Sequence, residues 1–262
     1  MAGFLLINPR SGKGSPDTAE LASQARSLGI ETHLLQEGED AAELARRSVA
    51  EAIGIAGGDG SLAAVAAVAI ERDVPFVCVP FGTRNHFARD LGLDRNDPVR
   101  ALRAFAGNER RVDVGRADER LFLNNVSLGL YARLVHRREE HRRRSELFAR
   151  LRAWGILLGK RDSLAITIDG NVFESRLVLV ANNRYVLELR SLGERERLDE
   201  GTLYVYTPDA EPAERHGETF HIDSGRHRLE AAFDGEPDVL ETPIVFRIEP
   251  GALRVLVPEG SG

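Results

Sequence analysis

The sequence predicts an N-terminal α/β domain with a parallel sheet, followed by a mainly antiparallel, β-sandwich-like domain. Over roughly the first 110 residues, short apolar segments alternate with helical segments of about ten residues. Glycine-rich breaks follow three of these apolar segments. After Val112 the apolar segments follow one another with only turns between them, apart from one helical segment. We place the boundary after residue 115, which gives domains 1–115 and 116–262.

The first domain is expected to contain four strands and three helices. Three of its strands are apolar runs followed by turns that contain Gly, and Asp40 can cap the second helix. The expected strands are 3–8, 31–35, 52–56 and 75–80, and the expected helices are 18–28, 40–51 and 61–70. In such sheets, ligands bind at the carboxyl ends of the strands, where all three glycine-rich breaks fall.

The second domain is expected to consist of seven strands and one charged helix. The strands are short apolar runs bounded by turn residues. They cover residues 112–114, 121–125, 163–168, 177–181, 201–206, 227–233 and 243–249, and the helical segment covers 133–158.

Composition excludes several classes of protein. With 262 residues, 42% of them hydrophobic, the chain is too apolar to be disordered. A single Cys excludes a disulfide scaffold and a cysteine-based zinc site, and the net charge of -6 argues against nucleic acid as a partner. No apolar stretch reaches the roughly 18 residues of a membrane span, and the N-terminus lacks the basic region of a signal peptide. We therefore expect a cytoplasmic protein.

The sharpest motif is Gly57-Gly58-Asp59-Gly60-Ser61, which an apolar strand enters and a helix leaves. Backbone N–H groups of the turn and of the helix N-terminus then converge, and such an arrangement binds phosphate oxygens. A carboxylate at position 59 suits phosphates only beside a Mg²⁺ or a ribose. The same dipeptides also occur in ordinary tight turns, and this plainer interpretation stays open.

Two further turns follow strands of the same sheet. Residues 80–89 place the hydroxyl of Thr83 and the amide of Asn85 after the fourth strand, although either residue also suits a helix N-cap. Residues 8–14 place small residues and two cations after the first strand. The spacing of a P-loop is absent there.

Together, these three segments resemble the catalytic domain of the diacylglycerol kinase and lipid kinase family, which includes sphingosine and ceramide kinases. The hallmarks of that family are NP-x-SG, GGDGT and PxGTxNDFAR, and the chain carries similar sequences in the same order. The resemblance continues at residues 113–115, 122–129, 198–203 and 233–237, so it covers nearly the whole chain.

The resemblance implies a kinase that transfers the γ-phosphate of ATP, with Mg²⁺, to the hydroxyl of a lipid such as diacylglycerol in phospholipid biosynthesis. The position of the general base corresponds to Glu236, which without the resemblance reads as a solvated loop acid. A Mg²⁺ site built largely from backbone carbonyls corresponds to Arg197, Glu200 and Thr202. The positions implied in ATP binding are Asn8, Pro9, Arg10, Ser11, Gly12, Gly57, Gly58, Asp59, Gly60, Ser61, Leu62, Ala63, Thr83 and Asn85.

Four positions depart from the family pattern. Ser61 stands in place of Thr and keeps the hydroxyl, and Leu35 stands in place of a Thr that contacts the nucleotide. His86 replaces Asp, which removes a negative charge and makes local binding sensitive to pH. Glu200 replaces Asp and has a longer reach. These departures bear on metal geometry, nucleotide affinity and activity.

A basic helical segment is the predicted membrane contact. Residues 133–152 contain eight Arg against three Glu, with apolar residues between them. A basic amphipathic helix suits an anionic membrane surface, here through Arg142, Arg143, Arg144 and Trp154. The alternative is an exposed helix whose Arg stems cover the sheet. The implied partner is a lipid at the inner face of a membrane, and a dimer stays open.

Two other functions remain open at this stage. One is a cofactor kinase of the NAD kinase type, which shares the GGDG motif but not the segments at 80–93 and 234–237. The other is a catalytically silent, ATP-binding or membrane-associated member of the lipid kinase family, which the departures at Leu35, His86 and Glu200 suggest.

Overall fold

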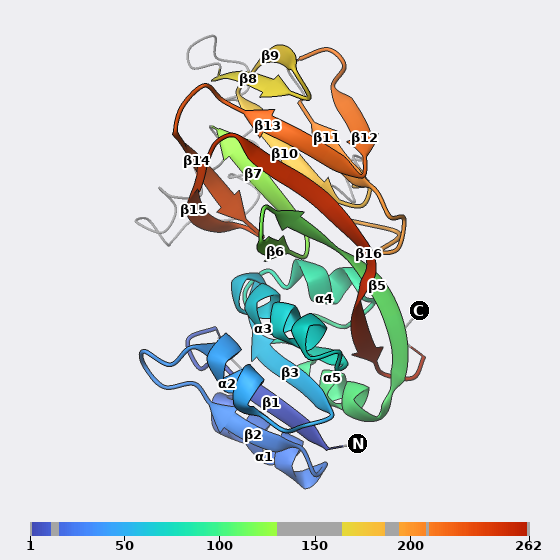
Figure 1. Cartoon of the computed structure of the whole chain (residues 1–262). Helices are drawn as coiled ribbons and strands as arrows, with labels where there is room; N and C mark the ends of the chain where they lie inside the picture. The colour runs from blue at the N-terminus through green and yellow to red at the C-terminus, as the bar shows by residue number, and fades with distance from the viewer. Residues whose placement is uncertain (1, 12–15, 130–163, 187–193, 208–209, 261–262) are drawn as a thin grey trace. The chain divides into compact units, whose positions relative to one another are not determined.

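Contacts between residues separate the chain into two units. The computed structural model describes residues 2–11, 16–129, 164–186, 194–207 and 210–260 (Figure 1). The first unit contains Met1–Val114, Tyr185–Glu200 and Glu249–Gly262, and the second contains Gly115–Arg184 and Gly201–Ile248. The predicted boundary after residue 115 lies beside the first of these divisions. The later returns of the chain to the first unit are not part of that prediction.

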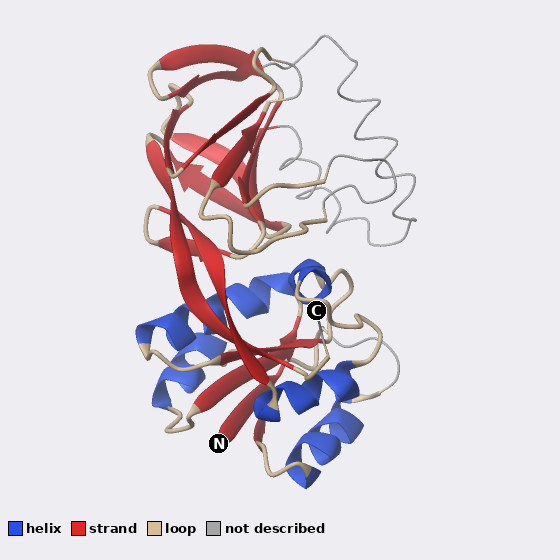
Figure 2. Ribbon diagram, turned by 90° about the vertical axis from the view of Figure 1, so that its right-hand side faces the viewer, coloured by secondary structure: helices blue, strands red, loops and turns tan. Residues whose placement is uncertain are grey.

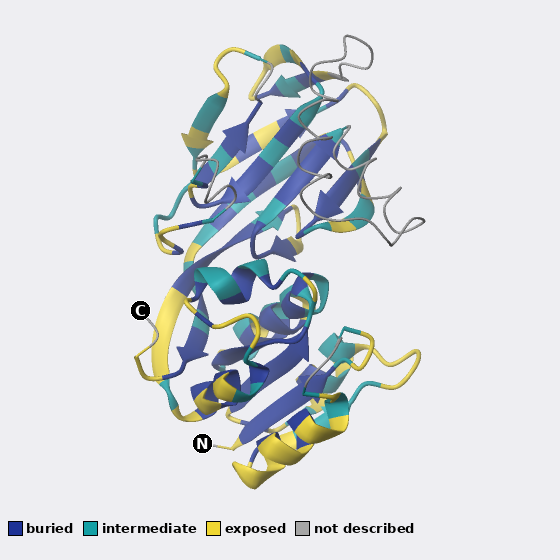
Figure 3. Ribbon diagram, turned by 180° about the vertical axis from the view of Figure 1, so that it is seen from behind, coloured by how far each residue is buried: buried dark blue, intermediate teal, exposed yellow. Residues whose placement is uncertain are grey.

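A parallel sheet forms the centre of the first unit. Its strands lie in the order β2-β1-β3-β4, and the end of β16 adds a further strand parallel to β4. The bounds are β1 (Gly3–Ile7), β2 (Glu31–Leu34), β3 (Ala52–Gly57), β4 (Phe76–Pro80) and β16 (Ile244–Val257). Residues of β1, β3 and β4 are buried throughout, as Figure 3 shows. The predicted α/β domain with a parallel sheet is confirmed.

Helices cover both faces of this sheet (Figure 2). They are α1 (Thr18–Ser27), α2 (Ala41–Arg47), α3 (Asp59–Glu71), α4 (His86–Asp90) and α5 (Pro98–Ala101), and a 3₁₀ helix (Leu102–Ala106) follows α5. Asp17, Asp40 and Asp97 cap α1, α2 and α5 by accepting backbone N–H bonds. Asp40 was the predicted cap of its helix.

Phe105 of the 3₁₀ helix packs directly onto the sheet. A Cβ on Gly3 would lie 2.6 Å from the Phe105 ring, and a Cβ on Gly54 would lie 2.8 Å from it. The ring therefore occupies the space that side chains at these two strand positions would need. Phe105 shares its hydrophobic cluster with Leu21 of α1 and with Leu256 of β16.

Two antiparallel sheets form the second unit, so the predicted sandwich is confirmed. One has the order β12-β11-β10-β7-β14-β15, and the other joins the first part of β16 to β13, β8 and β9. Strand β5 (Asn108–Ala117) begins in the first unit and ends in the second. The other bounds are β6 (Arg120–Phe122), β7 (Asn125–Gly129), β8 (Leu164–Ile168), β9 (Asn171–Ser175), β10 (Leu177–Asn182), β11 (Leu203–Tyr206), β12 (Glu214–Gly217), β13 (Thr219–Asp223), β14 (Arg228–Phe233) and β15 (Glu236–Glu241). Residues from both sheets, such as Val180 and Ile222, share one core.

Some predicted elements differ from the observed ones. The expected strand 121–125 is two strands, because the N–H groups of residues 123–125 bind the carboxylate of Asp234 at the break. The expected strand 243–249 continues as β16 to Val257. Strands β9, β12, β13 and β15 were not predicted, and the expected helix 133–158 lies outside the described residues. Among the described residues, no helix has the length and apolar character needed to cross a membrane.

Candidate active site

Three turns meet at the carboxyl edge of the parallel sheet. Asn8 follows β1, Gly58 follows β3 and Phe81 follows β4, and these strands are neighbours. The N–H of Asn8 donates to the carbonyl of Ala56 at 2.9 Å, and the N–H of Phe81 donates to the carbonyl of Gly57 at 3.3 Å. The structure therefore brings the three predicted segments together.

Two glycines allow close contact between the second and third turns. A Cβ on Gly82 would lie 2.6 Å from the Cα of Gly58 and 2.9 Å from Oδ1 of Asn85. A side chain at position 82 would therefore push the turns apart. Gly58 is the N-cap of α3 and has no side chain to bond the first turn. The N–H of Ser61 donates to the carbonyl of Gly58 at 3.0 Å, so an anion would be bound by the N–H groups that precede it, those of Asp59 and Gly60.

Gly82→Ala is expected to lower the affinity for a fluorescent ATP analogue by about tenfold or more, because overpacking of about 1–3 kcal/mol displaces the backbone of the turn. The affinity is measured by fluorescence titration. Gly217→Ala is the control, since its added Cβ meets Phe220 only at an ordinary 3.4 Å. Equal affinities for the two variants would show that the Gly58–Gly82 contact is not needed for binding.

Asn8 organises the first turn with both ends of its side-chain amide. Its Oδ1 accepts the N–H of Arg10 at 3.0 Å, and its Nδ2 donates to the Oγ of Ser61 at 3.2 Å. The Ser61 hydroxyl accepts this bond and keeps its own proton for another acceptor, such as a phosphate oxygen. Pro9 and Arg10 are exposed, and Arg10 forms a surface ion pair with Glu37 at 3.3 Å.

Asn85 holds the third turn. Its Oδ1 accepts the N–H of Gly82 and its Nδ2 donates to the carbonyl of Gly82, both at 2.9 Å, and the residue is 3% exposed. The two bonds occupy its amide, so a direct contact with a nucleotide stays a prediction. Asn85 is at the N-cap position of α4 but makes no capping bond. Thr83 is exposed, and its hydroxyl is therefore accessible.

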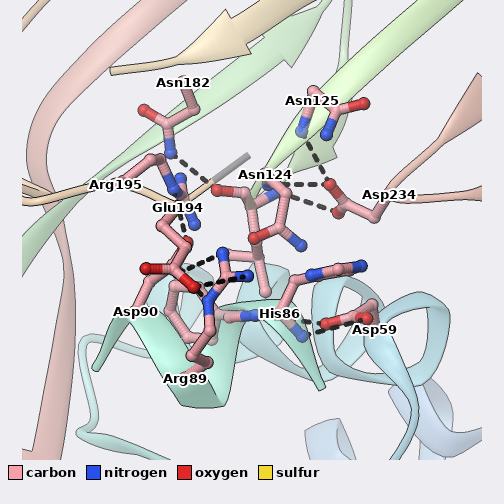
Figure 4. A network of polar contacts seen from close by, with 12 residues as sticks. Asp59, His86, Arg89, Asp90, Asn124, Asn125, Asn182, Glu194, Arg195 and Asp234 are labelled. Carbon is pink, nitrogen blue, oxygen red and sulfur yellow. Dashed lines mark hydrogen bonds and ion pairs between the residues drawn. The ribbon is translucent and has the colours of Figure 1, made fainter. Parts of the chain in front are cut away.

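The carboxylate of Asp59 caps α4 from the neighbouring turn. Its two oxygens accept the N–H groups of His86 and Phe87, each at 3.3 Å (Figure 4). A carboxylate at a helix N-terminus is favourable, so Asp59 has a structural role independent of any ligand. Burial lowers the pKa of His86 below its usual value of 6.5, while Asp59 acts in the opposite direction. The imidazole is therefore neutral at pH 7.

The other end of α4 carries a group of ion pairs. Asp90 Oδ2 accepts a bond from Nε of Arg195 at 2.8 Å, and Asp90 Oδ1 accepts bonds from Arg89 at 2.8 and 2.6 Å (Figure 4). Arg89 also lies 3.8 Å from Oε1 of Glu194. These contacts attach residues 194–195 to α4, and sequence analysis assigned no role to Asp90 or Arg195.

The residues predicted to bind Mg²⁺ follow residues 194–195 closely in the sequence. Arg197 and Glu200 belong to the first unit, and Thr202 lies just inside the second. The Arg197 side chain forms an exposed ion pair with Asp199 at 3.0 Å, which raises the pKa of Arg197. The carbonyl of Leu198 accepts the N–H of Asp113 at 2.7 Å.

The donor set of this turn fits Mg²⁺ only in part. Backbone carbonyls and the carboxylate of Glu200 are the oxygen donors that Mg²⁺ prefers. No group of three or more His, Cys, Asp and Glu that could hold a metal ion occurs in the portion of the chain that the structure describes. An ion at this turn would therefore depend largely on backbone carbonyls, as the resemblance implies.

Glu236 begins the second strand of a tight hairpin. It pairs with Phe233 across the two-residue turn Asp234-Gly235, in which both residues have positive φ (47° and 84°). The Asp234 carboxylate accepts N–H bonds from Leu123, Asn124 and Asn125 at 2.9, 2.7 and 3.0 Å (Figure 4). The sequence motif does not indicate a role for Asp234; in the structure its carboxylate anchors the hairpin tip that carries Glu236.

The remaining predicted residues are placed as follows. Leu62 is fully buried in α3 and its N–H donates to the carbonyl of Gly58 at 3.2 Å, so its contact with a nucleotide stays a prediction, while Ala63 and Gly60 are half-buried. The N–H of Ser11 donates to the carbonyl of Asn8 at 3.1 Å. Gly12 and the predicted membrane residues Arg142, Arg143, Arg144 and Trp154 lie outside the described residues.

Comparison with known proteins identifies the class. Residues 2–117 match the diacylglycerol kinase catalytic domain. A crystal structure of a diacylglycerol kinase from Bacillus anthracis has the same fold, with a TM-score of 0.70 at 20% identity over 100% of this chain and 98% of that chain. The fold and the three turns are thus those of a kinase catalytic domain with a β-rich second part.

Two curated relatives extend the match to nearly the whole chain. A YegS-like lipid kinase of Chromohalobacter salexigens is 28% identical, over 98% of this chain and 94% of the relative. A YegS-like lipid kinase of Pseudomonas aeruginosa is 26% identical, over 98% and 95%. The matches identify residues 2–117 as a diacylglycerol kinase catalytic domain, and nearly the whole chain is similar to these lipid kinases.

Proposed function

We propose that the protein transfers the γ-phosphate of ATP to the hydroxyl group of a membrane lipid, of which diacylglycerol is the first candidate. The observation that carries the proposal is the meeting of three turns at one sheet edge, where α3 begins at Gly58 without a side-chain cap. Such a helix start binds phosphate oxygens through backbone N–H groups. The match of residues 2–117 to the diacylglycerol kinase catalytic domain supports the acceptor class.

The proposed mechanism assigns separate tasks to the named residues. The first turn of α3 and the hydroxyls of Ser61 and Thr83 hold the phosphates. The lipid oxygen forms a bond to the γ-phosphorus while the bond to the β-phosphate oxygen breaks, and Glu236 takes the proton of the lipid hydroxyl. Mg²⁺ at the turn of Arg197, Glu200 and Thr202 would supply charge neutralisation. Little covalent chemistry is required of the protein beyond this positioning.

A transfer assay with two acceptors tests the proposal. Radiolabelled ATP and Mg²⁺ are incubated with the full chain and mixed micelles containing diacylglycerol, and in parallel with NAD. Label in the lipid supports the proposal, and label in NAD supports a cofactor kinase. Measurable ATP binding without any label indicates the silent family member. A screen of other lipid alcohols identifies the preferred acceptor.

The proposed reaction takes place at a membrane surface, because the acceptor lipid lies in a bilayer. A cytoplasmic protein would reach it by peripheral contact, for which Arg142, Arg143, Arg144 and Trp154 remain the predicted residues. Flotation of the full chain with vesicles of anionic lipid, compared with the triple neutral variant of these arginines, tests this contact.

A further inference from the structure

We propose that the buried ion pair of Asp90 and Arg195 positions the turn of residues 197–200 relative to the glycine-rich turn, with α4 as the rigid link between them. The inference rests on the proposed function, in which the first turn belongs to a Mg²⁺ site and the second holds phosphates. Arg195 and Asp90 are positioning residues in this account, and neither is placed in contact with substrate.

The pair is well suited to fix one geometry. Nε of Arg195 lies 2.8 Å from Oδ2 of Asp90, and the two side chains are 0% and 2% exposed. Removal of one partner from a buried pair leaves an uncompensated charge, so the geometry is held more strictly than by apolar contact alone. The Arg195 guanidinium also lies 5.9 Å from the ring centre of Tyr185, which belongs to the same part of the chain.

The helix between the two turns is held at both ends. At its N-terminus the N–H groups of His86 and Phe87 bind Asp59 of the glycine-rich turn. At its C-terminus Asp90 binds Arg195, two residues before Arg197. Helix α4 has only five residues, so these two attachments lie less than two helical turns apart.

One further bond holds the 194–200 segment to β5. The N–H of Asp113 donates to the carbonyl of Leu198 at 2.7 Å, while the Asp113 carboxylate accepts the N–H of Gly251 at the same distance. The amide of Asp113 therefore reports directly whether this segment keeps its place. Its hydrogen exchange can be measured without any activity assay.

The test compares Arg195→Met with Arg254→Met in the full chain. Met keeps an apolar side chain of similar length at position 195, and Asp90 retains Arg89 as a partner. Arg254 is the control, since it belongs to the same unit and its partners, Glu109 at 2.8 Å and the carbonyl of Asp73, lie outside α4 and residues 194–200. Three quantities are measured: hydrogen exchange of the Asp113 amide, the Mg²⁺ concentration for half-maximal lipid phosphorylation, and affinity for a fluorescent ATP analogue without Mg²⁺.

For Arg195→Met we expect faster exchange at Asp113 and a rise of about tenfold in the half-maximal Mg²⁺ concentration, as for other groups that orient metal ligands. Affinity for the nucleotide without Mg²⁺ should stay within about twofold, since Asp59 still caps α4. Arg195→Lys keeps the charge without the planar guanidinium and should give an intermediate effect. Arg254→Met should leave all three quantities unchanged.

Unchanged exchange at Asp113 together with unchanged Mg²⁺ dependence in Arg195→Met would overturn the inference. If that variant does not fold, the same measurements on Arg195→Lys and Asp90→Asn decide the question in the same way. If the wild-type chain phosphorylates no lipid, the proposed function fails, but the exchange measurement still shows whether the pair positions the segment.

Discussion

Glu236→Gln is expected to lower the rate of lipid phosphorylation by about 10²- to 10⁴-fold, the usual contribution of a general base. Gln has nearly the same shape as Glu but cannot accept the hydroxyl proton. The position is held by the Phe233–Glu236 pair of the β14–β15 hairpin, and the substitution leaves this backbone pairing in place. Affinity for ATP should not change, because Glu236 is not among the residues proposed to hold the phosphates.

Glu241→Gln is the matched control for this prediction. Glu241 is the last residue of the same strand, is exposed like Glu236 and has no proposed role. The activity of both variants is measured as the initial rate of label transfer from ATP to the lipid. Equal rates for Glu236→Gln and the wild-type chain would remove Glu236 from the mechanism.

Asp234→Asn is expected to lower the free energy of unfolding of the second unit by about 3 kcal/mol, since bonds to a charged acceptor contribute about 1.5–3 kcal/mol each. The carboxylate accepts three backbone N–H groups, and the residue is 6% exposed. An amide has one acceptor oxygen and brings donors toward the remaining N–H groups. Asn tolerates the positive φ at this position, so backbone strain does not explain the loss.

The measurement is urea denaturation followed by circular dichroism. Asp223→Asn is the control, because this carboxylate accepts one exposed N–H bond, from Gly225 at 2.9 Å. We expect it to change the free energy of unfolding by less than about 1 kcal/mol, as for surface sites. An equal decrease in the free energy of unfolding of both variants would show that the three bonds of Asp234 stabilise the unit no more than the single bond of Asp223.

The strands and turns of the first unit could be predicted because their signals are local. An apolar run such as residues 52–56 ends at Gly57, and both the strand and the break follow from a few neighbouring residues. Parallel packing then places the ends of β1, β3 and β4 at one edge. The position of the three turns therefore follows from sequence order and the rules of parallel sheets.

The partners of individual polar groups could not be predicted, because they come from distant parts of the chain. Asp59 caps a helix that begins 27 residues later, and Asp234 binds N–H groups 109 to 111 residues earlier. A local sequence pattern does not indicate which distant residue a polar group will contact. Asn85 is a different case, because its partner Gly82 is close in the sequence. An Asn before a helix is typical of an N-cap, but here its amide bonds the N–H and the carbonyl of Gly82.

Strand β16 was predicted too short for a reason that the structure makes plain. Pro250 and Gly251 interrupt the apolar pattern, and Gly251 has φ of 60°. The interruption does not end the strand, because the N–H of Gly251 finds an acceptor in the Asp113 carboxylate at 2.7 Å. Strand β12, with the sequence ERHG, gave no apolar signal at all.

The return of the last residues to the sheet of the first unit limits how the protein can be divided. A fragment that ends near residue 115 keeps all three turns but loses Val255 and Leu256, which pair with Phe76 and Val77 of β4. The side of β4 would then be an open edge, and open edges promote aggregation. Recombinant versions of the kinase half should therefore carry the C-terminal strand, for example through circular permutation.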